Sequence, residues 1–373
     1  MGLAIVALVT SIALSGQNSD RLPAGPIAAV QDDHLATVGT DGVTRRVEMV
    51  ADTGATTTRF DIFWSDIAPT EPADPRDPAD PAYDWSRVDA IARAFAERGI
   101  TPITSLYATP AWATPLPSHD PAPVVNPNAP TPAAFADVMA AVATRYSGHY
   151  VPPGASEPLP ELRRLELWNE PNLDAFMYPQ QRGGERRALA VYTEMVRRAY
   201  PAIKEANPEA VVIAGAAGPV GSTGPTRTGA LTWIEALRAA GVPMDAYSQH
   251  IYPSAPPKVP TSALPSWSSV GRLLEALDGI APGLPLYITE AGYTTADTDK
   301  RDRKVTEKQQ AEYLTDIFAL PQMQNDRIHA VVWFNLQDNA AWPAGLLRED
   351  GTAKPSMRAF KDVVRRQEGA RLG

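Results

Sequence analysis

The sequence predicts a single (β/α)8 barrel, and three observations lead to this fold class. From residue 26 onward, short apolar runs alternate with helical patterns, which is typical of a parallel sheet. Most connections from helix to strand are short, with residues 146–161 as the long exception, whereas those from strand to helix are long and rich in proline. Long loops after the strands build the active-site face of a barrel. A doubly wound sheet is the alternative, and no repeat or linker marks a second domain.

Eight apolar runs are the candidate strands. Seven of them are clear. The remaining one, "PIAAV" at 26–30, comes first along the chain and is weak. They occupy residues 26–30, 56–64, 100–107, 162–168, 210–216, 244–251, 284–290 and 328–334.

Six segments carry apolar residues at helical spacing. In the first, Val88, Ile91 and Phe95 share one face. In the second, we expect Thr131 to cap the helix and Pro132 to take its first position. The six segments are residues 84–99, 131–148, 186–208, 230–241, 269–279 and 306–320.

Composition excludes several classes of function. The formal net charge is −9 and the sequence pI is near 5.2, which argues against nucleic acid as a partner because phosphate binding needs a basic face. The chain has no cysteine, so disulfides, thiolate catalysis and Cys-ligated metals are excluded together. Its five histidines show no metal-ligand spacing, and we therefore expect no metal and no cofactor.

The N-terminus predicts export. Residues 1–22 form an apolar stretch and a short linker, with Asp20 as the first charged residue and Ser15 as a candidate cleavage point. The stretch suits a signal peptide or an apolar anchor and is too short to span a bilayer. A buried strand or helix is the alternative. Residues 23–373 would then form the catalytic domain, with no stable membrane span after processing.

Polar residues gather where the predicted strands end. Because strand ends of a barrel meet at one mouth, carboxylates distant in sequence can face each other there. The residues at these ends are Arg59, Asn169, Glu170, His250, Tyr252, Glu290, Trp333 and Asn335.

Two carboxylates at one mouth are what glycoside hydrolysis requires. Arg59 would keep one of them ionised, and the other, less compensated, would have a raised pKa and stay protonated. Aromatic rings suit the apolar faces of a sugar, and Trp112 is a candidate platform. Glu166 is interpreted as a buried structural residue, and Trp64 as part of the core.

Several motifs resemble one known group of enzymes. "LWNEPN" followed by "YITEAGY", "RFDIFWSDIAPTEP" with the unit after it, and "GLLREDGTAKPSMRAF" are similar to retaining glycoside hydrolases of clan A, in the branch around families 39 and 5. The resemblance covers about residues 28–365. The strand at 100–107 lacks a histidine that many family 5 members have there, and the chain has no room for the β-domain usual in family 39 xylosidases. A barrel-only bacterial member is therefore favoured.

The resemblance implies roles for individual residues. Glu170 would be the general acid/base and Glu290 the nucleophile. Asn169 would bind the 2-hydroxyl of the sugar, and Arg59 would lie beside Glu290. His250 and Tyr252 would line the same subsite, with Trp333 as its floor.

The expected protein is a secreted or surface-bound retaining O-glycosidase. It would hydrolyse β-glycosidic bonds of a poly- or oligosaccharide by double displacement, without a cofactor, and a monomer is favoured. The alternative is a barrel that binds carbohydrate but has lost catalysis.

Overall fold

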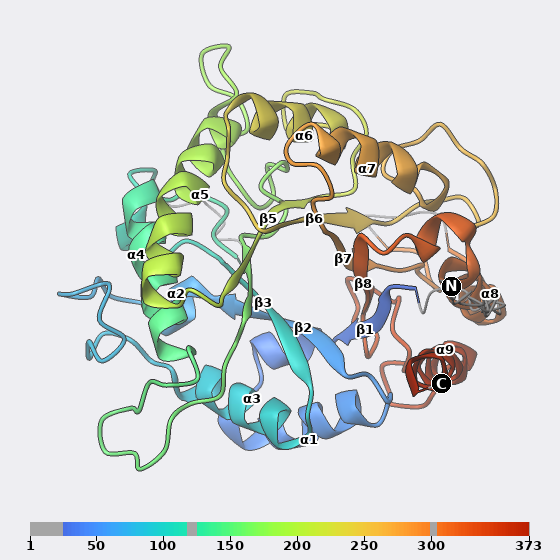
Figure 1. The fold of residues 1–373 in the computed structure, drawn as a ribbon, viewed down its shortest axis with the longest axis horizontal. Helices are drawn as coiled ribbons and strands as arrows, with labels where there is room; N and C mark the ends of the chain where they lie inside the picture. Colours follow the sequence, from blue (N-terminus) through green and yellow to red (C-terminus); the bar gives the residue numbers. More distant parts are fainter. Residues whose placement is uncertain (1–24, 118–124, 299–303, 373) are drawn as a thin grey trace, which may run out of the picture.

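The protein is described here by a computed structural model that covers residues 25–117, 125–298 and 304–372. Eight parallel strands close into a barrel in the order β1 to β8, and Figure 1 shows them as a central ring with the helices outside. The predicted fold class is confirmed. The doubly wound alternative is wrong, because the first and last strands pair along their length. The predicted export signal, residues 1–22, lies outside the described residues and stays a prediction.

The strands match the eight apolar runs to within two residues at either end. The run at 162–168 gives a shorter strand than predicted, because Trp168 adopts a φ of 78° and leaves the extended conformation. The strands are β1 (Ile27–Gln31), β2 (Thr57–Phe63), β3 (Thr101–Tyr107), β4 (Arg164–Leu167), β5 (Val211–Ala217), β6 (Ala246–Ile251), β7 (Leu286–Ala291) and β8 (Ile328–Phe334).

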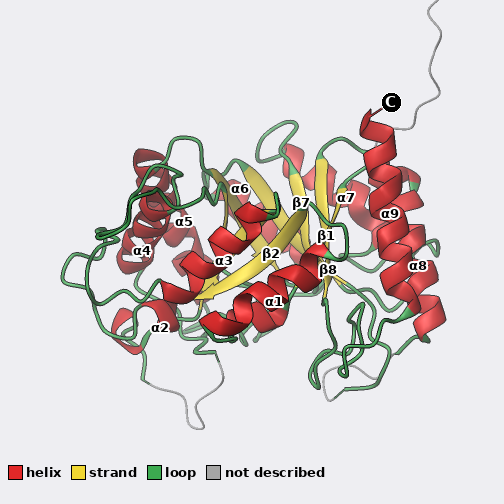
Figure 2. Ribbon diagram, turned by 90° about the horizontal axis from the view of Figure 1, so that it is seen from below, coloured by secondary structure: helices red, strands yellow, loops and turns green. Residues whose placement is uncertain are grey.

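All six predicted helices form, and the described residues contain three more, α1, α2 and α9. The pattern of α1 is hard to recognise because its buried residues Val43, Val47 and Val50 are β-branched. Helix α9 packs beside α8 along one side of the barrel (Figure 2). The helices are α1 (Thr40–Ala51), α2 (Trp64–Ile67), α3 (Ser86–Glu97), α4 (Pro132–Arg145), α5 (Arg187–Ala206), α6 (Ala230–Ala239), α7 (Val270–Asp278), α8 (Glu307–Ala319) and α9 (Pro355–Leu372). Within the described ranges, none combines the length and apolar character needed to cross a membrane.

Thr131 takes the N-cap position of α4 as predicted, but its side chain makes no capping hydrogen bond to the helix. Its hydroxyl and its amide both donate to the carbonyl of Ala113, at 3.1 and 2.8 Å. Pro132 does take the first helical position. Thr131 therefore fixes the start of α4 to the loop after β3.

The barrel interior is layered. An apolar layer fills the middle of the barrel. Along each strand, residues that point into the barrel alternate with residues that pack outward against the helices. The inward residues nearer the carboxyl ends of the strands are polar, and they include Gln31, Arg59, Asp61 and Glu166, all buried. The apolar layer consists of Ala29, Ile103, Ile213, Ala246, Tyr287, Ala330 and Val332.

Gly215 lies at an irregular point of the barrel wall. The register between β5 and β6 shifts between Ala214 and Ala217, and Gly215 adopts a φ of 100°. The next residue, Ala216, accepts a hydrogen bond at 2.8 Å from the amide of Glu170. The irregularity therefore fixes the loop that carries one of the predicted catalytic carboxylates.

We expect Gly215→Ala to destabilise the protein by about 2 kcal/mol or more. An added Cβ would lie 2.3 Å from a ring carbon of Tyr247, at a backbone angle that L-residues rarely adopt. Gly271→Ala is the matched control, because its Cβ would meet no atom within 4 Å and alanine favours a helix by up to about 1 kcal/mol. Urea unfolding of both variants measures the difference. Equal stability of the two would contradict the expectation.

Candidate active site

Arg59 is the centre of the polar layer. Its side chain has 0% exposure, and strand β2 places it inside the barrel. It donates to Glu166 Oε2 at 2.6 Å and to Glu290 Oε1 at 2.9 Å. It also donates to Gln31 Oε1 at 2.6 Å and to Asn169 Oδ1 at 2.9 Å. Since Arg59 occupies that amide oxygen, Asn169 keeps its amide nitrogen as a donor.

The two predicted catalytic carboxylates lie together at the mouth. Glu170 follows β4, with a φ of 43°, and Glu290 lies near the end of β7. His250 Nδ1, from β6, is 2.8 Å from Glu170 Oε1 and 3.4 Å from Glu290 Oε2. One donor or acceptor atom from each of the three residues lies within 4.8 Å of the others. Residues 120 positions apart therefore share one small site.

Tyr252 completes the environment of Glu290. Its hydroxyl donates to Glu290 Oε2 at 2.8 Å, while Arg59 binds the other oxygen. The Tyr252 ring packs edge-on against Trp342, with centroids 4.9 Å apart, and against Phe334, at 6.4 Å. One wall of the site is thus aromatic and suits the apolar face of a sugar.

Burial determines the ionisation of Glu290 more than Arg59 does. Burial raises the pKa of Glu290, and His250 and Arg59 oppose this only in part. Arg59 does lower the pKa of this carboxyl, as its position beside Glu290 implies, but burial raises it more. That Arg59 keeps Glu290 ionised stays a prediction. Burial disfavours a charged His250 ring, but Glu290 and Glu170 outweigh it and raise the pKa of His250.

Two carboxylates at the same mouth were missed. Asp61 lies two residues after Arg59 on β2, accepts from Gln31 Nε2 at 3.0 Å and is 3.3 Å from Arg59 Nη1. Burial, with Asp61 and Glu290 adding to it, raises the pKa of Asp33 to about 7. The signal for Asp61 was present in "RFD", because residues two apart on a strand share a face. Asp33 lies in the short helix after β1, where no sequence periodicity indicates the direction in which a side chain points.

Trp333 is not the floor of the site. Val332 belongs to the apolar layer inside the barrel, so Trp333 points outward, where its indole donates to the carbonyl of Ala344 at 2.9 Å. Phe334 lies two residues after Val332, so its side chain faces the inside of the barrel. There its ring contacts the ring of Tyr252. Asn335, also predicted at this strand end, is buried and accepts from the amide of Asp33 at 3.0 Å.

Trp112 is half-buried in the loop after β3. Its indole donates to the carbonyl of Ala68 at 2.8 Å, and its ring packs edge-on against Trp64. These contacts hold it near the end of β2. Its role as a sugar platform stays a prediction, whereas Trp64 is fully buried, as expected of core.

Glu170, His250 and Glu290 have the donor types of a metal site. However, both oxygens of Glu290 already accept hydrogen bonds, one of them from a guanidinium. A nearby permanent cation disfavours a second one. The group suits proton transfer better than metal binding.

One family of known proteins matches most of the chain. The pattern of the cellulase family, glycosyl hydrolase family 5, matches residues 36–339. The absence of a histidine from the strand at 100–107 therefore does not exclude family 5. A search of curated proteins found no match.

Solved structures share the fold. A family 39 glycoside hydrolase from the gut symbiont Bacteroides cellulosilyticus WH2 has 21% identity and a TM-score of 0.61, covering 91% of this chain and 64% of its own. A GH39 β-xylosidase from Caulobacter crescentus has 20% identity and a TM-score of 0.62, with coverages of 91% and 72%. An exo-β-1,4-mannosidase from Opitutaceae bacterium strain TAV5 has 19% identity and a TM-score of 0.59, with coverages of 93% and 60%.

We expect Glu166→Gln to lower the free energy of unfolding by about 3 kcal/mol at neutral pH, because it removes a buried partner of Arg59. Although burial opposes it, Arg59 lowers the pKa of Glu166 from 4.5. The stabilisation is therefore complete above pH 4.5 and is lost as pH falls through the lower folded-state pKa.

The difference between variant and wild type should therefore shrink under acid conditions. Urea unfolding at several pH values measures it. Glu209→Gln, which removes only an exposed pair with Arg163, is the control and should change stability by less than about 1 kcal/mol. A difference in the free energy of unfolding between Glu166→Gln and wild type that does not change with pH would contradict the pairing of Glu166 with Arg59.

Proposed function

The chain belongs to the cellulase family, glycosyl hydrolase family 5, and we propose that it is a retaining glycosidase. Its substrate would be a poly- or oligosaccharide with β-glycosidic bonds. Glu290 would be the nucleophile and Glu170 the general acid/base, in a double displacement.

The separation of the two carboxylates carries this proposal. An oxygen of Glu170 lies within 4.8 Å of an oxygen of Glu290. Retaining enzymes keep their carboxyl groups about 5–5.5 Å apart, whereas inverting enzymes leave about 6.5–9.5 Å for a water molecule. The short spacing supports direct attack by one carboxylate on the sugar.

In the first step, Glu290 attacks the anomeric carbon and forms the glycosyl–enzyme bond. Glu170 gives its proton to the leaving oxygen as the glycosidic bond breaks. Tyr252 and Arg59 each hold one oxygen of Glu290 in a fixed direction. The nucleophile is therefore oriented before the substrate arrives.

In the second step, Glu170 removes a proton from water, whose oxygen attacks the anomeric carbon and releases Glu290. Two inversions give net retention. His250 lies 2.8 Å from Glu170 and stabilises its ionised form between the two steps. Asn169 is fixed by Arg59 with its amide nitrogen free to donate to a sugar hydroxyl.

We expect Glu290→Gln to lower kcat by about 10³-fold or more, because the amide cannot form the intermediate. Binding of the polysaccharide should survive, since the replacement keeps the shape of the side chain. Initial rates on β-linked polysaccharides and aryl glycosides measure this, and Glu275→Gln, an exposed change on α7, is the control. Full activity of Glu290→Gln would rule out this nucleophile. A wild-type protein that binds polysaccharide but turns over no substrate would favour the non-catalytic alternative.

Glu170→Ala should separate the two roles. We expect a loss of about 10²–10⁴-fold with poor leaving groups and a much smaller loss with dinitrophenyl glycosides, which need no proton to depart. Proton NMR of the first product anomer should show retention. An inverted first product would contradict double displacement.

The raised pKa of Glu290 predicts the acidic limb of the pH profile. The nucleophile must be ionised, so kcat/KM should fall with decreasing pH through a pKa above 4.5. His250→Gln removes a cation that lowers the pKa of Glu290, and the limb should therefore move to higher pH. A limb below pH 4.5, or a shift of the variant to lower pH, would contradict this account.

A further inference from the structure

A cavity opens at the end of the barrel opposite to the carboxylates. It has a volume of about 350 Å³ and is lined by the first residues of several strands, including Ile27 of β1, Thr57 of β2 and Arg164 of β4. The catalytic carboxylates lie at the opposite ends of the strands, and the apolar layer separates the two sites. Nothing in the proposed mechanism uses this cavity.

Arg164 is the unusual residue of this cavity. Its Nη1 atom is buried and has no hydrogen-bond partner, and in the described part of the chain no carboxylate pairs with it. Its neighbour in sequence, Arg163, pairs with Glu209 at 2.9 Å, and Arg59 has several partners. A guanidinium with a buried and unpartnered nitrogen is costly, and protein interiors normally supply an acceptor.

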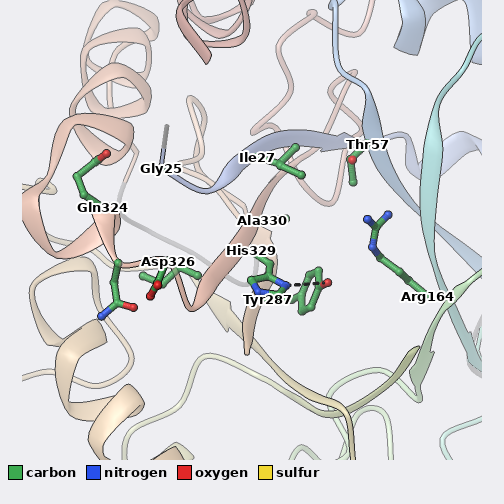
Figure 3. A pocket seen from close by; sticks show the side chains of 11 residues that line it. Gly25, Ile27, Thr57, Arg164, Tyr287, Gln324, Asp326, His329 and Ala330 are labelled. Atoms are coloured by element: carbon green, nitrogen blue, oxygen red, sulfur yellow. Dashed lines mark hydrogen bonds between the residues drawn. The ribbon is translucent and has the colours of Figure 1, made fainter. Parts of the chain in front are cut away.

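Arg164 provides the positive charge of the cavity, because the histidine that also lines it is neutral. Tyr287 and His329 form a hydrogen bond of 3.1 Å across its middle. Burial, and next the charge of Arg164, lower the pKa of His329, so its ring is neutral at pH 7. Figure 3 shows Arg164 and Thr57 on one side of this pair and Asp326 on the other.

We propose that this cavity binds a small monocarboxylate, held by the guanidinium of Arg164. The planar fork of arginine matches a carboxylate with two parallel hydrogen bonds, and the Thr57 hydroxyl is a further donor on the same side. The volume exceeds that of one water molecule, about 30 Å³, roughly tenfold. Asp326 on the far side disfavours ligands of higher negative charge and can accept from hydroxyl groups, as a sugar acid would offer.

The test is thermal unfolding of the full chain at constant ionic strength and pH 7. Sodium acetate and sodium glucuronate are titrated against sodium chloride, with phosphate as a separate arm. We expect the two carboxylates to raise Tm by about 2 °C or more in a saturable manner. No response to either carboxylate would overturn the proposal. A response to phosphate at lower concentration would overturn the assignment to carboxylates.

Variants locate the effect. Arg164→Gln should abolish the rise in Tm and, without anion, should melt at or above the wild-type temperature, because the unpartnered charge is gone. Arg163→Gln is the matched control and should respond like wild type. Glu290→Gln should also respond, because binding is not at the catalytic mouth. If Arg164→Gln responds like wild type, or Glu290→Gln does not respond, the site is wrong.

Thr57→Val provides a second variant that preserves shape. It removes one donor and should weaken acetate binding about fivefold, the effect of one ordinary hydrogen bond. Unchanged affinity, measured by calorimetric titration of acetate, would remove Thr57 from the site and contradict the proposed geometry.

Discussion

A single buried cation, Arg59, organises the mouth of this barrel. A guanidinium with no exposure must be surrounded by acceptors, and its acceptors come from β1, from β4 with the loop after it, and from β7. These contacts join strand ends that are far apart in sequence. One charge therefore determines both the packing of the polar layer and the direction of the Glu290 carboxylate.

The surplus of carboxylates around Arg59 controls the chemistry that the site can perform. Glu166, Glu290 and Asp61 all lie within 3.3 Å of its nitrogens, so one positive charge is shared among three acids. Glu166, closest to the cation, has a lowered pKa, whereas Glu290 and Asp61 have raised pKa values through burial. The acids thus differ in proton affinity because of position, which general acid–base catalysis requires.

An arginine lies at each end of the barrel, and the charges of the two arginines are compensated differently. At the carboxyl ends Arg59 is matched by acids of the chain itself. At the amino ends Arg164 faces a cavity of about 350 Å³, and no carboxylate of the described residues forms an ion pair with it. The apolar layer between them keeps the two arrangements independent, so occupancy of one need not alter the other.

The sequence alone determined the barrel, its strand positions and the grouping of Arg59, Asn169, Glu170, His250, Tyr252 and Glu290, because strand and helix periodicity are local and parallel strands converge at one end. It did not determine which residues at the end of β8 point into the barrel, where Phe334 and not Trp333 faces the mouth. The pKa of Glu290 and the exposure of Arg164 to a cavity were also decided only by tertiary structure. The physical reason is that register, burial and charge compensation depend on neighbours distant in sequence, which no local pattern specifies.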